Sequence, residues 1–133
     1  MTNILTATSG NIVMTWDPEV RLAVIRFERE TDATGDDAAT LVNALTGWIG
    51  VDGKPFGLMG DGAGLRTVDA QYRSVWGNFL RKHREDSHTA FFNMGAIIRV
   101  AAEMFGIGTR LRLKTFSDER EARAWLRKMG IAA

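Results

Sequence analysis

Strand-like and helix-like segments alternate along most of this chain, and the alternation constrains the fold more than any other feature. From residue 55 onwards the order is strand, helix, strand, helix, strand, helix, with short connections. This order favours an α/β fold with a mainly parallel sheet and right-handed crossovers. At 133 residues the chain is expected to form a single domain, residues 1–133.

Five segments predict a five-stranded sheet that begins with an N-terminal β-hairpin. The hairpin strands, 12–16 and 21–27, are rich in β-branched and aromatic residues and flank the turn signal Asp-Pro-Glu. Strand 21–27 is apolar on both faces, which is typical of a strand covered on both sides. The later strands are 55–60, 88–94 and 110–116. The last one alternates apolar and basic residues and is therefore expected at an edge.

Four main helices are expected between and after these strands. Thr34 and Asp37 form a capping-box pattern before the first helix, which Gly50 ends. Asp69 opens the second helix, and the third spans 95–106. Ser117 is expected to cap the fourth helix, which carries acidic residues in its first turn and basic residues in its last.

The turn after strand 55–60 contains Gly60-Asp61-Gly62-Ala63-Gly64, at the strand end where ligands bind in open α/β sheets. It is not a Walker loop, and Leu65 stands where a dinucleotide fingerprint requires its third glycine. Asp61 would also repel a phosphate group. A conformational role for the glycines is therefore favoured over a phosphate site.

The third helix is apolar around most of its circumference, with Arg99 and Glu103 as an i, i+4 polar pair. Such a helix is covered on more than its sheet side. One interpretation is a helix wedged between neighbouring helices. In the other it faces an apolar ligand or a partner, for which Met104 and Phe105 would form an adaptable surface.

Composition excludes several classes of chemistry. The chain has no cysteine, so disulfides, thiol nucleophiles and cysteine-based zinc sites are excluded, and a cytoplasmic location is expected. No nucleophile, base and orienting group occur together, so we expect no enzyme, no cofactor and no metal site. The basic residues alternate with acidic ones, which argues against nucleic acid. No segment approaches the length of a membrane span, and the N-terminus lacks the pattern of a signal peptide.

The order of elements and the C-terminal segment 116–126, Phe-Ser-Asp-Glu-Arg-Glu-Ala-Arg-Ala-Trp-Leu, resemble the SpoIIAA-like branch of the STAS superfamily. The resemblance implies a singly wound β/α domain with helices on one sheet face, the fold shared with SEC14-type lipid carriers. It also implies a non-enzymatic role. Related anti-sigma factor antagonists carry Asp-x-Ser/Thr-Gly at this turn and are phosphorylated on the hydroxyl. Here the aligned residue is Ala63, so that switch is expected to be absent, and Thr67 is the only nearby hydroxyl.

These observations predict a binding domain for an apolar or lipid-like small molecule, held at the surface formed by turn 60–66 and helix 95–106. Arg66 and Arg99 would meet an anionic headgroup. The alternative is a regulatory protein–protein interaction module, including a homodimer, that uses the same surface. The expected site residues are Asp61, Gly62, Ala63, Gly64, Arg66, Arg99, Met104 and Phe105.

Overall fold

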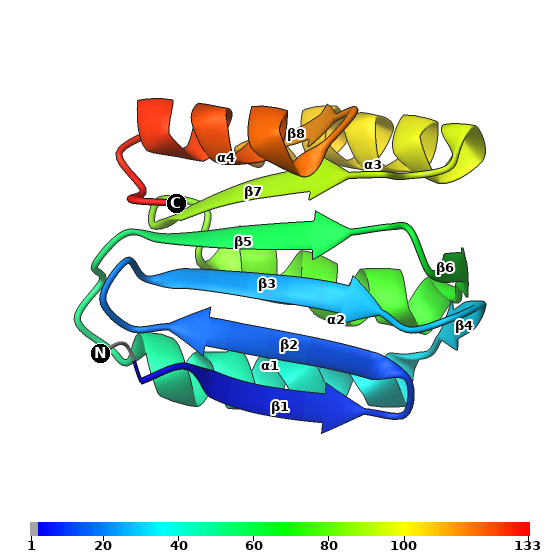
Figure 1. Cartoon of the computed structure of the whole chain (residues 1–133), viewed down its shortest axis with the longest axis horizontal. Helices are drawn as coiled ribbons and strands as arrows, with labels where there is room; N and C mark the ends of the chain where they lie inside the picture. The colour runs from blue at the N-terminus through cyan, green and yellow to red at the C-terminus, as the bar shows by residue number, and fades with distance from the viewer. Residues whose placement is uncertain (1–2) are drawn as a thin grey trace.

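The structure, a computed structural model, describes residues 3–133, apart from the side chains of residues 97, 101, 104, 105 and 107–109. Its centre is a six-stranded mixed sheet with strand order β1-β2-β3-β5-β7-β8 (Figure 1). The first three strands of this order are antiparallel, and β3, β5, β7 and β8 run parallel. The sheet strands are β1 (Leu5–Ser9), β2 (Ile12–Asp17), β3 (Leu22–Phe27), β5 (Phe56–Asp61), β7 (Ser87–Phe92) and β8 (Leu113–Phe116).

The expected α/β fold, the hairpin and the edge position of β8 are confirmed, but the sheet has six strands rather than five. The additional strand, β1, pairs with β2 at the other edge of the sheet and is largely exposed. A second, two-stranded sheet joins β4 (Thr31–Ala33) to β6 (Leu65–Val68), in segments for which no strand was predicted. It lies beyond the carboxyl ends of the parallel strands (Figure 1).

The helices are α1 (Gly35–Ile49), α2 (Ala70–Lys82), α3 (Ala96–Thr109) and α4 (Glu119–Lys128). Thr34 and Asp37 form the expected capping box, and Asp69 accepts from the backbone N–H of Tyr72 at 2.6 Å. The expected cap of the last helix is wrong by one residue. Asp118, rather than Ser117, is extended and accepts from the N–H of Glu121 at 2.9 Å, because its carboxylate lies at the correct distance from the first free N–H groups.

The helices cover both faces of the sheet. Helices α1 and α2 pack on the face that carries Met14, Ile25 and Leu58, and α3 lines a cavity on that same face. Helix α4 lies on the opposite face (Figure 1), where Leu126 packs against Met59. The implied arrangement with helices on one face is therefore wrong for α4. The strands between the two layers are apolar on both faces, as predicted for β3.

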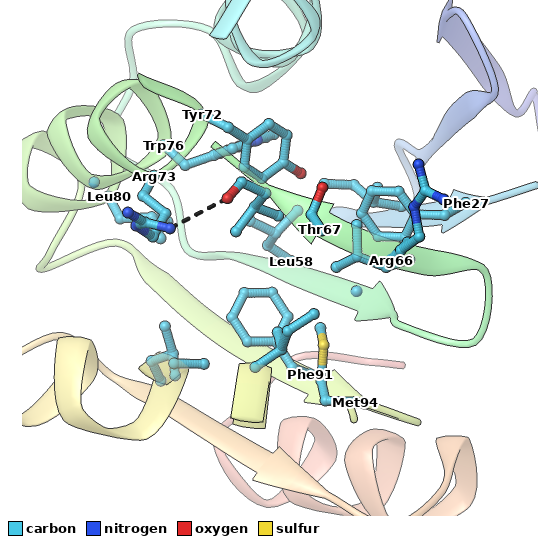
Figure 2. Close-up of a pocket in the computed structure, with 18 residues that line it drawn as sticks. Phe27, Leu58, Arg66, Thr67, Tyr72, Arg73, Trp76, Leu80, Phe91 and Met94 are labelled. Carbon is cyan, nitrogen blue, oxygen red and sulfur yellow. Dashed lines mark hydrogen bonds between the residues drawn. The ribbon is translucent and has the colours of Figure 1, made fainter. Parts of the chain in front are cut away.

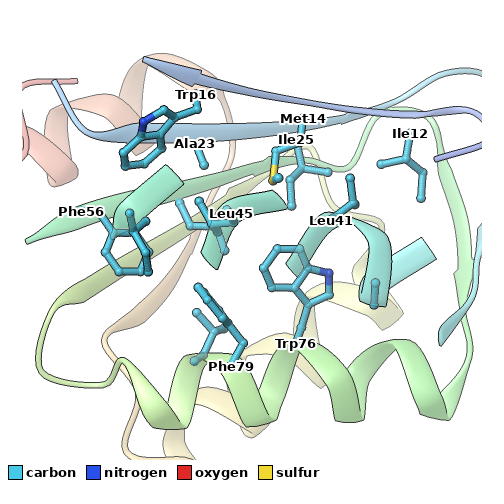
Figure 3. Packing of buried hydrophobic residues seen from close by; sticks show 14 of the residues in the cluster. Ile12, Met14, Trp16, Ala23, Ile25, Leu41, Leu45, Phe56, Trp76 and Phe79 are labelled. Atoms are coloured by element: carbon cyan, nitrogen blue, oxygen red, sulfur yellow. The ribbon is translucent and has the colours of Figure 1, made fainter. Parts of the chain in front are cut away.

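The larger core fills the space between the sheet, α1 and α2 (Figure 3). Leu41 and Leu45 of α1 are fully buried there. From α2, Trp76 and Phe79 meet edge to face with ring centroids 5.7 Å apart, and Phe79 lies 6.1 Å from Phe56. These ring contacts pack α2 closely against the sheet, and Leu41 and Leu45 of α1 belong to the same buried cluster.

Over the residues that the structure describes, no helix has both the length and the apolar character needed to cross a bilayer.

Candidate functional site

A cavity of about 480 Å³ opens between α2 and α3, above the sheet (Figure 2). Apolar side chains dominate its lining, and the polar groups lie on β6 and at the start of α2. Its volume falls within the range of small-molecule pockets, about 300–1,000 Å³. The lining residues are Ile25, Phe27, Leu58, Gly60, Leu65, Arg66, Thr67, Val68, Tyr72, Arg73, Trp76, Gly77, Leu80, Phe91, Met94, Ile98, Ala102 and Leu113.

Small residues and the position of α3 explain why this space is open. Gly77 of α2 and Ala102 of α3 line the cavity and contribute almost no side-chain volume. Helix α3 packs on the edge strand β8, where a Cβ on Gly106 would lie 3.3 Å from Leu113. This close approach holds α3 above the sheet edge and leaves the space towards α2 unfilled.

The glycine turn lies at the mouth of the cavity, but only its flanks line it. Gly60 and Leu65 contribute to the lining, whereas residues 61–64 do not. A Cβ on Gly64 would lie 2.0 Å from the carbonyl oxygen of Phe27, so this position requires glycine. The N–H of Ala63 donates to Asp61 Oδ1 at 3.0 Å, and the N–H of Gly62 to the carbonyl of Phe92 at 2.8 Å. These N–H groups are used within the protein, which supports a conformational role for the turn.

Asp61 fastens the ends of three neighbouring strands together. Its carboxylate accepts from Arg26 Nη1 at 2.8 Å and from Asn93 Nδ2 at 3.2 Å. Arg26 also reaches Glu119 of α4, at 3.1 Å. These contacts assign Asp61 to the support of the turn rather than to the cavity.

Arg66 lines the cavity rim but is paired with carboxylates. Its Nε donates to Asp32 Oδ1 at 2.9 Å, a second bond joins Nη2 to Oδ2, and Glu30 lies 3.9 Å away. Thr67 donates to Asp32 at 2.7 Å. The hydrogen bonds from Arg66 and Thr67 hold the pKa of Asp32 far below its usual range, so this pair is ionised at neutral pH.

Tyr72 and Arg73, both in the first turns of α2, complete the polar part of the rim (Figure 2). Burial raises the pKa of the Tyr72 phenol, an effect that the indole N–H of Trp76 opposes only in part. That indole N–H is buried and meets no acceptor with full hydrogen-bond geometry among the described residues. Arg73 Nη1 donates to the carbonyl of Val68 at 3.2 Å.

Neither Tyr72 nor Arg73 was among the site residues expected from the sequence. One signal was available: a cation near the start of a helix opposes the helix dipole, so Arg73 is not placed there to stabilise the helix. From α3, Ile98 and Ala102 line the cavity and were not singled out. Their role depends on how far α3 stands from α2, which the sequence does not give.

The other expected site residues have different positions. Arg99 forms the expected pair with Glu103, at 3.3 Å, and also donates to Thr115 of β8 at 3.2 Å, so it fastens α3 to the sheet and does not line the cavity. The bond from Thr115 lowers the pKa of Glu103, with a further contribution from Arg99. The side chains of Met104 and Phe105 lie outside the described residues.

Among the described residues, no group of three or more His, Asp or Glu side chains is placed to share a metal ion. The two histidines lie on different elements and pack against aromatic rings. His83 contacts Phe79, with centroids 4.6 Å apart, and His88 lies 5.9 Å from Trp125 on the α4 face.

Solved structures that share this fold include the following two. One is an uncharacterized protein of the DUF3478 family from Shewanella loihica PV-4, described as having a SpoIIAA-like fold. It is 16% identical, covers 94% of this chain and 93% of its own, and has a TM-score of 0.65. The other is the murine anion transporter solute carrier 26 family member A9, 12% identical with a TM-score of 0.61. That match covers 96% of this chain but 22% of the transporter.

No protein-family model and no curated protein sequence matches the chain. The structural matches show that it has the SpoIIAA-like fold, as the sequence resemblance implied. At these identities they define the fold alone. The use of the cavity therefore has to be argued from this chain's own residues.

Proposed function

We propose that this protein is a non-enzymatic binding domain that holds an apolar, lipid-like small molecule between α2 and α3. The observation that carries the proposal is the cavity of about 480 Å³, whose floor and walls are apolar. An empty apolar space of this size costs stability, since its lining loses dispersion contacts that a ligand would restore. The SpoIIAA-like fold is consistent with a regulatory or interaction role for such a domain.

The way the lining is built supports this proposal. Leu58 and Phe91 form the floor, from strands that the rest of the core holds in place. Ile98 approaches from α3 and Leu80 from α2, so a ligand would be enclosed between two helices. A rigid apolar enclosure with polar groups at one rim is the usual form of a small-molecule site. A chain without cysteine suits a reducing compartment, so a cytoplasmic location is part of the proposal.

A cavity-filling substitution tests the proposal. Ala102→Phe adds a phenyl ring to the cavity wall, whereas Ala124→Phe adds the same ring to an exposed position of α4. Native mass spectrometry after gentle extraction should detect a co-purifying apolar molecule on the wild type and on Ala124→Phe. The Ala102→Phe variant should have lost it.

Binding should also be measured directly, by titrating the ligand-free protein with dodecanol. The wild type should bind it, and Ala102→Phe should bind it at least about tenfold more weakly, since about 1.4 kcal/mol of lost contact has that effect. No binding to the wild type in either experiment, or equal binding to both variants, would rule out this use of the cavity.

A second candidate is a homodimer or a partner interface on α3. The observation that favours it is Val100, which is 55% exposed on the same helix as the cavity-lining Ile98. Such an interface would work without phosphorylation, because Ala63 occupies the turn position where relatives carry a hydroxyl. Sedimentation at several protein concentrations tests the dimer, and a monomer at all of them would exclude it.

A further inference from the structure

Charge is distributed unequally around the cavity. Among the described residues that line it, two are cationic, Arg66 and Arg73, and none carries a carboxylate. Both lie on the polar rim, one on β6 and one on α2 (Figure 2). The opposite wall, with Ile98, Ala102 and Leu113, is apolar. A ligand with two chemically different ends would match this arrangement.

The two arginines differ in how far their charge is already compensated. Arg66 is held by two bonds to Asp32, with Glu30 also near, and these carboxylates raise the pKa of its guanidinium further. A salt-bridged arginine of this kind offers little attraction to another anion, since the ligand would have to compete with Asp32.

Arg73 has no carboxylate within ion-pair distance among the described residues, and its Nη1 donates to the carbonyl of Val68. Asp69, the acid nearest in sequence, is engaged by the N–H of Tyr72 at 2.6 Å and that of Gly35 at 3.4 Å. Most of the N–H donors of Arg73 are therefore available, at the edge of an apolar space. An arginine fork is well suited to a carboxylate or a phosphate.

Tyr72, the neighbour of Arg73 in sequence, adds a neutral donor to the same rim. A phenol is protonated at neutral pH, and burial raises the pKa of Tyr72 further, so its hydroxyl remains a donor there. A protonated hydroxyl and an uncompensated guanidinium at one rim favour an anionic group over a cationic one.

We propose that the ligand is a single-chain amphiphile with an anionic headgroup, which Arg73 binds at the rim while the chain lies between α2 and α3. This inference rests on the proposed function, because it needs the cavity to hold a ligand. The cavity volume of about 480 Å³ lies in the lower half of the range for small-molecule pockets. One acyl chain suits that space better than the two chains of a phospholipid.

The test compares three probes on three proteins by isothermal titration calorimetry. Dodecanoate carries both a chain and a charge, dodecanol carries the chain alone, and acetate carries the charge alone. The proteins are the wild type, Arg73→Gln and Arg81→Gln. Arg81 is the matched control because it is exposed on the same helix and does not line the cavity.

The wild type should bind dodecanoate about tenfold to a hundredfold more tightly than dodecanol, the gain expected from a charge-assisted hydrogen bond. Arg73→Gln should lose that preference while still binding dodecanol, Arg81→Gln should keep it, and acetate should not bind. Dodecyl phosphate in place of dodecanoate then distinguishes a phosphate head from a carboxylate head.

Four results would overturn the inference. Equal binding of dodecanoate and dodecanol to the wild type, or an unchanged preference in Arg73→Gln, would remove the headgroup site and leave the proposed function intact. Acetate binding as tight as that of dodecanoate would indicate a plain anion site. If no chain-bearing probe binds the wild type, the proposed function itself fails. Arg73 is exposed, so Arg73→Gln should fold. The comparison of dodecanoate with dodecanol on the wild type tests the inference even without that variant.

Discussion

Helix α2 has two neighbours on the same sheet face, and it meets them in opposite ways. Towards α1 the space is closed by Leu41 and Leu45 packing with Trp76 and Phe79. Towards α3 a cavity of about 480 Å³ remains. The floor is apolar under both gaps, so the difference does not come from the sheet.

The difference between the two gaps comes from side-chain size and from the position at which α3 contacts the sheet. The α1 junction is filled by leucines and interlocking rings, whereas Gly77 and Ala102 contribute almost nothing to the second gap. Helix α3 is bonded to β8 through Thr115, at the far edge of the sheet. A few small residues therefore turn one of two similar junctions into a candidate binding site, while the other stabilises the fold.

The largest expected effect comes from truncating matched aliphatic residues in the two gaps. Leu41→Ala removes a fully buried side chain from the closed gap and should cost about 2–5 kcal/mol of unfolding free energy. Ile98→Ala removes a half-buried side chain that already faces open space, and should cost about 1 kcal/mol or less. Urea unfolding of the ligand-free protein measures both. Equal losses would show that the second gap is packed as tightly as the first.

Enlarging a residue should also destabilise the closed gap more than the open one. Ala38 of α1 is fully buried in the closed gap, so Ala38→Phe should overpack it and cost about 1–3 kcal/mol or more. Ala102→Phe places the same ring in the open gap and should change the stability by about 0.5 kcal/mol at most, or increase it. Thermal unfolding of the two variants compares them directly. Destabilisation of Ala102→Phe to the same extent would mean that the cavity cannot admit a ring.

Local signals in the sequence were sufficient for much of this architecture. The capping box at Thr34, the cap at Asp69 and the hairpin before β3 depend on neighbouring residues, and each lies where it was predicted. The short exposed strand β1 was missed because the residues 5–9 show no burial pattern, with most of them facing solvent. The β4–β6 pair was missed because its two segments lie more than thirty residues apart in the chain.

The sequence indicated the region of the candidate site, but it did not indicate most of the residues that line it. The space beside turn 60–66 and helix 95–106 is where the cavity lies. Of the residues expected to face it, Arg66 does, Arg99 instead binds Thr115, and Asp61 supports the turn. Which side chains face a cavity depends on the separation of two helices that are joined through other elements. That separation is set by packing over the whole sheet, and residue patterns do not encode it locally.

The smallest expected effect concerns two carboxylates, one at the start of α1 and one that binds Arg66 beside the cavity rim. Asp37, at the start of α1, accepts from Ser9 at 2.6 Å and from the N–H of Thr34 at 3.0 Å. Burial acts to raise the pKa of Asp37, but these hydrogen bonds outweigh it and the pKa is lowered. At neutral pH Asp37→Asn should cost about 1 kcal/mol, because it weakens the capping box that Asp37 forms with Thr34. Asp32→Asn, at the exposed cavity rim, should cost less, because an exposed ion pair contributes little.

The pH dependence sharpens this last contrast. A carboxyl group whose pKa is lower in the folded than in the unfolded state contributes stability that is present above the unfolded pKa, about 3.9, and is lost as the pH falls through the folded value. The stability difference between the wild type and Asp37→Asn should therefore be full at pH 7 and shrink below about pH 4. Urea unfolding at a series of pH values measures it. A difference that stays constant down to pH 2 would show that the charge of Asp37 is not what fixes the start of α1.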